Sequence, residues 1–119
     1  MLVLEMKSRN MIYFRPKKYG NKTCFVDGIR FDSRREADYY GQLKIEKKAK
    51  MILAFERQIE FDLIVNGHKI CAHRVDFYVT VSPGKKEVRE VKGFATDVWN
   101  LKRKLFEALY PEIPYKVIR

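Results

Sequence analysis

Two acids and a lysine in the second half of the chain have the residue types and the spacing for phosphate chemistry. Asp76 lies in one predicted strand, and Glu90, Val91 and Lys92 lie in the next, beyond a short Ser-Pro-Gly segment at 82–84. Because side chains alternate across a β-strand, Glu90 and Lys92 share a face and Val91 points the other way. If the 82–84 segment closes a three-residue hairpin, antiparallel pairing sets Asp76 directly opposite Glu90.

Two carboxylates opposed across a sheet repel each other, and a divalent cation offsets that repulsion better than a neighbouring lysine does. Asp76 and Glu90 are hard oxygen ligands that suit Mg²⁺ or Mn²⁺, and the carbonyl of Val91 is a candidate third ligand. Lys92 would position or deprotonate the attacking water, or hold a phosphate oxygen. The stretch therefore predicts metal-assisted hydrolysis of a phosphodiester.

These residues also have purely structural interpretations. The structural alternative for Asp76 is a solvent-facing acid paired with Arg74. For Glu90 and Lys92 it is an exposed strand face with Lys86, Glu87 and Arg89 around them. An E-x-K sequence alone is common. The functional interpretation gains weight from the combination of an acid on the preceding strand, an acid on an earlier helix, a basic helix afterwards and a surplus of positive charge.

The overall composition favours a nucleic-acid partner. The 119 residues predict one domain, and an apolar content of 46% argues against disorder. A formal net charge of +10 and a pI of about 9.7 indicate a polyanion, nucleic acid first and an anionic membrane surface second. No apolar run is long enough to span a bilayer, and the first seven residues are too short and too acidic for a signal segment.

The two cysteines, Cys24 and Cys71, lack any zinc-type or CxxC neighbour. They indicate reduced thiols in a cytoplasmic protein, with a disulfide between them as the alternative.

Residues 1–22 lack a clean period and are expected to form a basic arm, ahead of a core at 23–119. Its basic residues would neutralise phosphates and its aromatics would stack on unpaired bases. The alternative is a solvated tail whose aromatics dock on the domain. The candidate DNA-binding residues of the whole chain are Arg15, Lys17, Lys18, Lys22, Arg34, Lys102, Arg103 and Lys104.

A small hairpin with an Asp-Gly turn is predicted at 23–31. A helix then opens at Ser33 and runs to about Lys50, because Ser33 is a favourable N-cap and Glu36 stands three residues on, which is a capping-box pattern. Glu36 also lies on the stripe that faces the core. The cap and metal coordination both remain interpretations of Glu36, and one carboxylate can serve both.

Three antiparallel strands are predicted next, at about 52–65, 69–81 and 86–92, with an Asn-Gly turn between the first two. Gln58 on the first strand has the parity to reach the face of Asp76, so it is a candidate for orienting water at the site. On the second strand, alternation places Val75, Phe77, Val79 and Val81 on one face and Arg74, Asp76, Tyr78 and Thr80 on the other.

A second helix is expected from Thr96 or Asp97 to about Tyr110, followed by a strand at 115–118. Its predicted buried stripe consists of Val98, Leu101, Leu105 and Leu109, with Trp99, Phe106 and Tyr110 beside them. A basic cluster is expected on its other side, at Lys102, Arg103 and Lys104. The element order predicts an α/β fold of the α+β type: helix, three-stranded antiparallel meander, helix, strand.

This order, with Glu36, Gln58, Asp76 and the Glu90–Lys92 run in place, resembles the PD-(D/E)xK nuclease superfamily and its restriction-endonuclease-like core. The chain also resembles small phage-encoded endonucleases described as Holliday-junction resolvases. The matching phrases are KYGNK at 18–22, VDGIRFDS at 26–33, EA at 36–37, EVKG at 90–93 and LKRKLF at 101–106. One departure is that Val75, and not proline, precedes Asp76.

The resemblance implies Mg²⁺-dependent, structure-selective cleavage of branched DNA by a homodimer with one active site per subunit. It implies that Asp76 and Glu90 bind metal, that Lys92 is catalytic, and that Glu36 completes the site. It further implies the host cytoplasm for a phage-encoded protein. A less selective DNA nuclease and a non-catalytic nucleic-acid-binding protein are the alternative functions.

Overall fold

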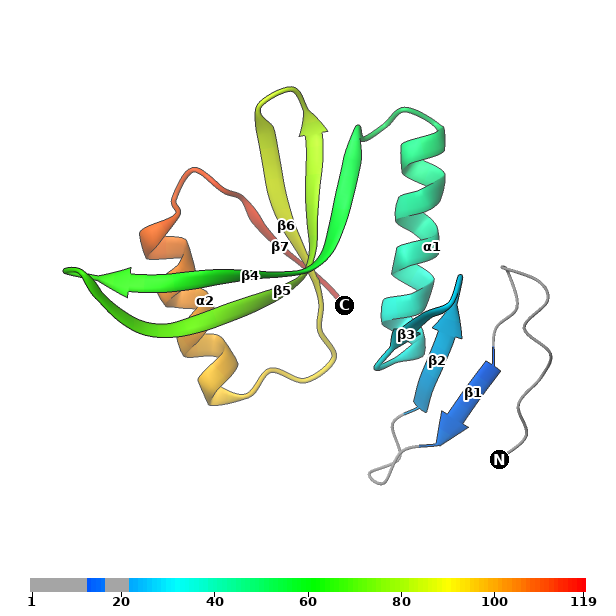
Figure 1. The fold of residues 1–119 in the computed structure, drawn as a ribbon, viewed down its shortest axis with the longest axis horizontal. Coiled ribbons are helices and arrows are strands. Elements are labelled where there is room, and N and C mark those ends of the chain that lie inside the picture. Colours follow the sequence, from blue (N-terminus) through cyan, green and yellow to red (C-terminus); the bar gives the residue numbers. More distant parts are fainter. Residues whose placement is uncertain (1–12, 17–21) are drawn as a thin grey trace. The chain divides into compact units, whose positions relative to one another are not determined.

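The computed structural model describes residues 13–16 and 22–119, and within them the chain forms a mixed α+β structure of seven strands and two helices (Figure 1). The chain separates into two compact units, Met1–Ile45 and Glu46–Arg119, which we describe one at a time. Neither of the helices in the described ranges has the length and apolar character needed to cross a bilayer.

The first unit contains a three-stranded antiparallel sheet in the order β1 (Tyr13–Pro16), β2 (Lys22–Val26), β3 (Ile29–Phe31). The turn between β2 and β3 has positive φ at both central residues, 54° at Asp27 and 77° at Gly28. That is the conformation a two-residue hairpin turn with an Asp-Gly sequence adopts. The hairpin predicted at 23–31 is therefore confirmed.

Part of the predicted basic arm is an edge strand. The β1 strand pairs with β2 from Tyr13 opposite Phe25 to Pro16 opposite Lys22. A two-stranded hairpin is marginal by itself, and the third strand gives the backbone groups of β2 partners on both sides. Within the predicted arm, Tyr13–Pro16 form this strand, and residues 1–12 and 17–21 lie outside the described residues.

Helix α1 (Arg34–Lys48) begins as the sequence predicts. The Glu36 backbone N–H donates to Ser33 Oγ at 3.1 Å, so Ser33 caps the first turn. Further along, the Tyr40 hydroxyl donates to Asp27 at 3.1 Å, and Lys44 forms an ion pair with the same carboxylate. These contacts attach the helix to the hairpin turn within the first unit.

The second unit is a four-stranded mixed sheet, with α2 (Asp97–Leu109) as the connection between its last two strands. The first three strands are antiparallel, and the last runs parallel to its neighbour, which requires a crossover of this kind. The strands, in spatial order, are β4 (Ala54–Val65), β5 (His68–Ser82), β6 (Lys85–Val91) and β7 (Tyr115–Ile118). The predicted meander, helix and final strand are confirmed.

The core of this unit lies between the sheet and α2 (Figure 1). Leu63, Val75, Val88 and Phe106 are fully buried there, one from each of β4, β5, β6 and α2. The ring of Phe61 meets that of Phe106 edge-on, with centroids 5.0 Å apart.

The predicted buried stripe of α2 is wrong at two positions. Val98 and Leu101 are 64% and 67% exposed, whereas Trp99 and Phe106 are the buried residues of this helix. Trp99 and Phe106 are seven residues apart, or two turns, so they define the face that meets the sheet. Consecutive residues on a helix lie about 100° apart, so Val98 points away from the face that Trp99 occupies.

The two long strands β4 and β5 bend midway, as Figure 1 shows. Val75 and Tyr78 both pack against the core under α2, although residues three apart on a regular strand face opposite sides. The strict alternation predicted for this strand therefore fails between Val75 and Tyr78. The bend coincides with Gln58, which has a φ of 53° between the ladder pairs Arg57–Phe77 and Ile59–Val75.

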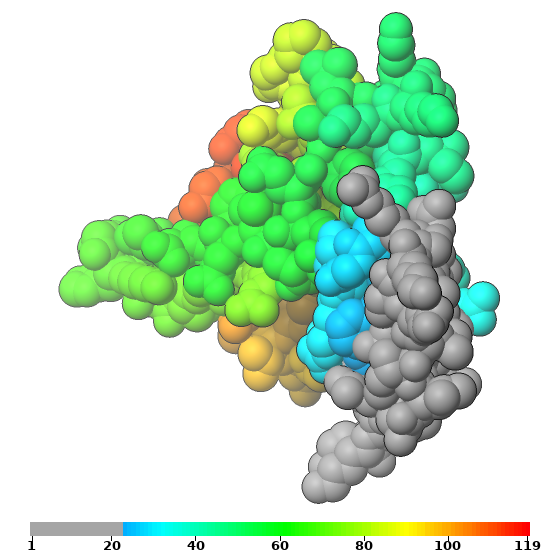
Figure 2. Space-filling model, turned by 45° about the vertical axis from the view of Figure 1, so that its right-hand side comes forward, coloured from blue at the N-terminus to red at the C-terminus, as the bar shows by residue number. Residues whose placement is uncertain are grey.

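The outer ends of β4 and β5 project from the rest of the second unit (Figure 2). Their turn has φ values of 51° at Asn66 and 79° at Gly67, which confirms the predicted Asn-Gly hairpin. Ile64 and Ile70 are exposed on this projecting part.

Both cysteines are free thiols, as expected. Cys24 is buried in the first unit, where its Sγ lies 3.6 Å from the carbonyl oxygen of Ser33. Burial and the nearby Asp38 carboxylate raise the pKa of the Cys24 thiol, so it is a poor nucleophile. Cys71 is half-buried against the core of the second unit.

Phe106 and Leu101 offer a direct test of which face of α2 is buried. We expect Phe106→Ala to lower the free energy of unfolding by about 3–5 kcal/mol, because it leaves a cavity between helix and sheet. Leu101→Ala is the matched control and should change it by less than about 0.5 kcal/mol. Urea denaturation of both variants would measure this, and a larger loss for Leu101→Ala would contradict the described packing.

Candidate active site

The β5–β6 register brings Asp76 to Glu90. Phe77 pairs with Arg89 on the antiparallel ladder, and one further step in the same register sets Asp76 opposite Glu90. The sequence analysis predicted this opposition, and one hydrogen bond between the two residues confirms their contact.

The turn that produces this register differs from the one expected. Ser82 pairs with Lys85 across a two-residue turn, whereas Thr80 pairs with Lys86, so the register shifts by one residue between Thr80 and Ser82. Val81 is the extra residue of this bulge. The tighter turn and the bulge together give the same register downstream as a simple three-residue hairpin would.

Asp76 and Glu90 each bind the backbone of the opposite strand. The Asp76 backbone N–H donates to Glu90 Oε1 at 2.9 Å, and the Val91 backbone N–H donates to Asp76 Oδ2 at 2.9 Å. Side-chain oxygens thus accept from backbone donors at the end of the β5–β6 ladder. Bonds to a charged acceptor are stronger than those between neutral groups, so they hold both carboxylates in place.

Glu90 is an unusual carboxylic acid. It is only 4% exposed, and its pKa is raised from 4.5 to about 7, first by burial and then by the nearby Asp76 carboxylate. Donors from the Asp76 backbone and the Trp99 ring, and the charge of Lys92, oppose this rise. A buried acid beside a second acid is an arrangement that a bound cation would stabilise.

Trp99 connects this acid pair to α2, and the sequence analysis did not identify it as a site residue. Thr96 caps the helix by accepting from the Trp99 backbone N–H at 3.1 Å. From this first turn, the Trp99 Nε1–H donates to Glu90 Oε2 at 3.3 Å. Lys92 Nζ lies 5.0 Å from the centroid of the indole ring, a cation–π contact. Trp99 therefore contacts both the buried acid and the candidate catalytic lysine.

His73 and Tyr115 form a second polar pair that sequence reasoning missed. His73 Nε2 and the Tyr115 hydroxyl share a hydrogen bond of 2.8 Å. Burial, and then the positive charges of Lys102 and Lys92, lower the pKa of His73 to about 4, so the ring is neutral near pH 7. Burial and the Glu90 carboxylate raise the pKa of Tyr115 well above its usual range. The pair is uncharged at neutral pH.

The basic residues of α2 do not all lie where they were expected. Arg103 packs inward, with its guanidinium carbon 5.8 Å from the Trp99 ring centroid and 5.1 Å from that of Tyr115, and it forms an ion pair with Glu107. The predicted outward cluster is wrong for Arg103, because its flat cation stacks on aromatic faces. Lys102 is half-buried and Lys104 is exposed.

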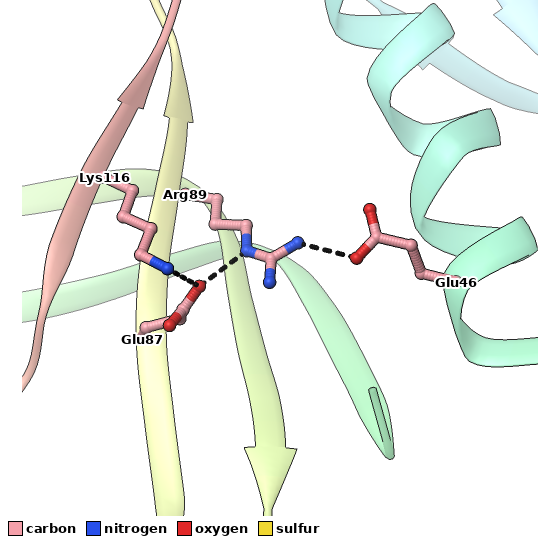
Figure 3. A network of polar contacts seen from close by, with 4 residues as sticks. All are labelled: Glu46, Glu87, Arg89 and Lys116. Atoms are coloured by element: carbon pink, nitrogen blue, oxygen red, sulfur yellow. Dashed lines mark hydrogen bonds and ion pairs between the residues drawn. The ribbon is translucent and has the colours of Figure 1, made fainter. Parts of the chain in front are cut away.

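Charged residues on the same strand as Glu90 are also buried, and this weakens the interpretation of an exposed charged face. Arg89 Nε donates to Glu87 at 2.7 Å, and its Nη1 donates to Glu46 at 3.1 Å (Figure 3). Lys116 on β7 adds a 3.2 Å ion pair to Glu87. The four side chains balance two negative charges with two positive ones, and they fix β6 in the sheet.

Gln58 lies across the sheet from Asp76. The ladder pairs on either side of it, Arg57–Phe77 and Ile59–Val75, set these two residues opposite each other. Its left-handed backbone is uncommon for a non-glycine residue, and such conformations concentrate at functional sites. Its predicted role in orienting water stays a prediction.

The remaining predicted residues belong to the first unit. Glu36 is half-buried in the first turn of α1, and its predicted role as a metal ligand stays a prediction. Arg34 is exposed and pairs with Asp38 at 3.8 Å. The side chains of Arg15 and Lys22, and all of Lys17 and Lys18, lie outside what the structure describes.

The donor chemistry at Asp76 and Glu90 fits a hard divalent cation. Within residues 23–119, no group of three or more Asp, Glu, His or Cys side chains is arranged to hold a metal. Mg²⁺ is commonly held by one or two carboxylates, with waters and substrate phosphates as the other ligands. Two carboxylates held close enough for one to raise the pKa of the other meet that requirement.

The fold and site thus define a basic α+β protein with an acid pair, half-buried Asp76 and buried Glu90, and a lysine at the end of the β5–β6 ladder. The chain belongs to the family described as "Protein of unknown function (DUF1064)", whose family model matches residues 16–119. No curated protein and no solved structure matches the chain.

The raised pKa of Glu90 makes a prediction about stability. Folding favours the protonated acid. The contribution of Glu90 to the free energy of unfolding is therefore fully present below pH 4.5 and is lost as the pH rises to about 7. In a chelating buffer, the stability of the wild type relative to Glu90→Gln should fall by roughly 3 kcal/mol across this window. Urea denaturation at a series of pH values measures it, and a difference independent of pH would show that Glu90 is not perturbed.

Proposed function

We propose that this protein is a metal-dependent DNA endonuclease that hydrolyses phosphodiester bonds. The observation that carries the proposal is the acid pair, because Asp76 and Glu90 each accept a hydrogen bond from the backbone of the other's strand. Lys92, two residues after Glu90, contacts the Trp99 ring that also donates to Glu90. An ion-pair role for Asp76 and Glu90 would not require burial or a Glu90 pKa of about 7.

Each residue has a distinct task in this chemistry. Asp76 and Glu90 would hold the cation, with the Val91 carbonyl and Glu36 as further candidate ligands. Bound Mg²⁺ or Mn²⁺ supplies a Lewis acid and lowers the pKa of a coordinated water. Lys92 orients or deprotonates the attacking water, or holds a phosphate oxygen. Trp99 fixes the carboxylate of Glu90 and the ammonium of Lys92 relative to each other.

The topology of the second unit supports the proposal. Its antiparallel strands β4, β5 and β6, followed by α2 and the parallel strand β7, are in the order expected of a restriction-endonuclease-like core. The acids lie on the second and third of these strands, where the resemblance to PD-(D/E)xK nucleases implies them. Selectivity for four-way junctions and a homodimeric state rest on the resemblance to phage Holliday-junction resolvases.

The proposed substrate agrees with the charge of the chain. With a formal net charge of +10, the protein favours a polyanion, and exposed Lys104 and half-buried Lys102 add positive charge beside the site. Binding DNA through such residues releases counterions, so its affinity should fall steeply as salt concentration rises.

The proposal predicts cleavage that depends on the acid pair and on the lysine. With Mg²⁺, the wild type should cut a synthetic four-way junction, and Asp76→Ala and Lys92→Ala should each cut it about 100-fold more slowly or worse. Junction binding should survive or tighten in Asp76→Ala, because a charge that repels phosphate is removed. Gel-based cleavage with Mg²⁺ and with a chelator, and anisotropy for binding, measure both.

Asp62→Ala is a suitable control, since Asp62 is an exposed acid on β4 that pairs with Lys69. Cleavage retained in pure Asp76→Ala protein would refute the site. Equal rates on the junction and on a matched linear duplex would favour a less selective nuclease, whereas binding without any cleavage would favour the non-catalytic alternative.

A further inference from the structure

Phe94 is the most exposed of the large hydrophobic residues in the described part of the chain, at 81%. It lies in the short segment between β6 and the Thr96 cap of α2. An aromatic ring left in water forgoes the free energy that burial of its apolar area would provide, and a partner that covers the ring would recover it. The segment is anchored on both sides, by the Lys92 N–H bond to Ile118 O at 3.0 Å and by the Thr96 cap.

The ring is close to the candidate catalytic lysine. Only Gly93 separates Phe94 from Lys92, so their Cα atoms are at most about 7 Å apart. Successive nucleotides in a strand are spaced by about 3.4 Å along the helix axis. A base that contacts Phe94 therefore lies within a few nucleotides of a phosphate held at Lys92.

The surrounding charge favours nucleic acid over a second copy of the chain as the partner. Between residues 92 and 104 there are four basic residues and one acid, Asp97. A two-fold contact through this segment would bring like patches together, because such an interface uses the same surface twice. A polyanion with apolar base faces instead matches both the positive charge and the exposed ring.

We propose that Phe94 stacks on a base face that has no stacked neighbour, next to the scissile phosphate, and thereby selects nucleic acid with exposed base faces. The inference rests on the proposed nuclease function for the position of the phosphate. In a continuous duplex every base is covered by its neighbours, and only a strand end, a branch point or a single strand offers a free face. Phe94 supplies a physical basis for structural selectivity that the acid pair and the lysine do not contain.

Binding of the full chain to DNA in a chelating buffer tests the proposal without cleavage. The probes are a four-way junction with 2-aminopurine at the branch point and a linear duplex of matched sequence. Phe94→Ala should lower the ratio of junction to duplex affinity by roughly 5- to 150-fold, the range for loss of one stacked base. The wild type should change the fluorescence of 2-aminopurine when it binds the junction, and Phe94→Ala should abolish that change. Ile70→Ala, which removes another exposed apolar side chain, should do neither.

Phe94→Trp separates stacking from simple hydrophobicity. It should restore the affinity ratio, and its indole fluorescence should be quenched by the junction, against the background of the single native tryptophan, Trp99, which is buried. An affinity ratio for Phe94→Ala equal to that of Ile70→Ala would overturn the inference, even if the wild type cuts DNA with Mg²⁺. If the Phe94 effects appear but no metal-dependent cleavage does, the nuclease proposal fails and base stacking stands. No binding to either DNA would overturn both.

Discussion

The second unit's candidate site depends on the hydrogen bonds that Asp76 and Glu90 accept across the β5–β6 ladder, Glu90 from the Asp76 N–H and Asp76 from the Val91 N–H. Each carboxylate accepts a backbone N–H of the opposite strand, so the two acids complete the β5–β6 ladder where it ends. Burying Glu90, and then holding it near the Asp76 carboxylate, has a cost that is seen in the raised pKa of Glu90. A bound cation would offset the repulsion between the two carboxylates. The same acid pair can therefore complete the β5–β6 ladder and hold a metal ion.

The position of α2 follows from the same acid. Trp99 reaches Glu90 from the first turn of the helix, and Phe106 fills the core two turns later, so one helix face supplies both a hydrogen bond to the site and its hydrophobic support. The contacts of Lys92 and Arg103 with the indole ring then place two cations near the acids. On the neighbouring positions of β6, the balanced ion pairs of Glu87 and Arg89 restrain the strand. The acid is thus held by its own strand, by the adjacent strand and by the helix.

Because β4 and β5 bend, the same pair of strands contributes both to the core under α2 and to the acid pair. With Gln58 in a left-handed conformation opposite Asp76, the side-chain alternation of β5 changes phase between Val75 and Tyr78. The residues on the outer side of the bend cover the core under α2, while the bend itself coincides with the acid pair. Strained backbone at this position is consistent with a site whose geometry is maintained by the surrounding sheet.

Local rules were sufficient for most of the elements and for the acid pair. The Asp-Gly and Asn-Gly turns, the Ser33 and Thr96 caps, and the opposition of Asp76 and Glu90 follow from short-range preferences and from the period of a strand, and they were predictable. The buried face of α2, the phase change at Tyr78 and the inward position of Arg103 were not, because each depends on which surface packs against the helix. The contact of Trp99 with Glu90 likewise joins residues whose side chains meet only when the helix docks on the sheet. Sequence periodicity identifies a helix and its apolar residues. Which of those residues of α2 are buried is decided by how the helix packs on the sheet.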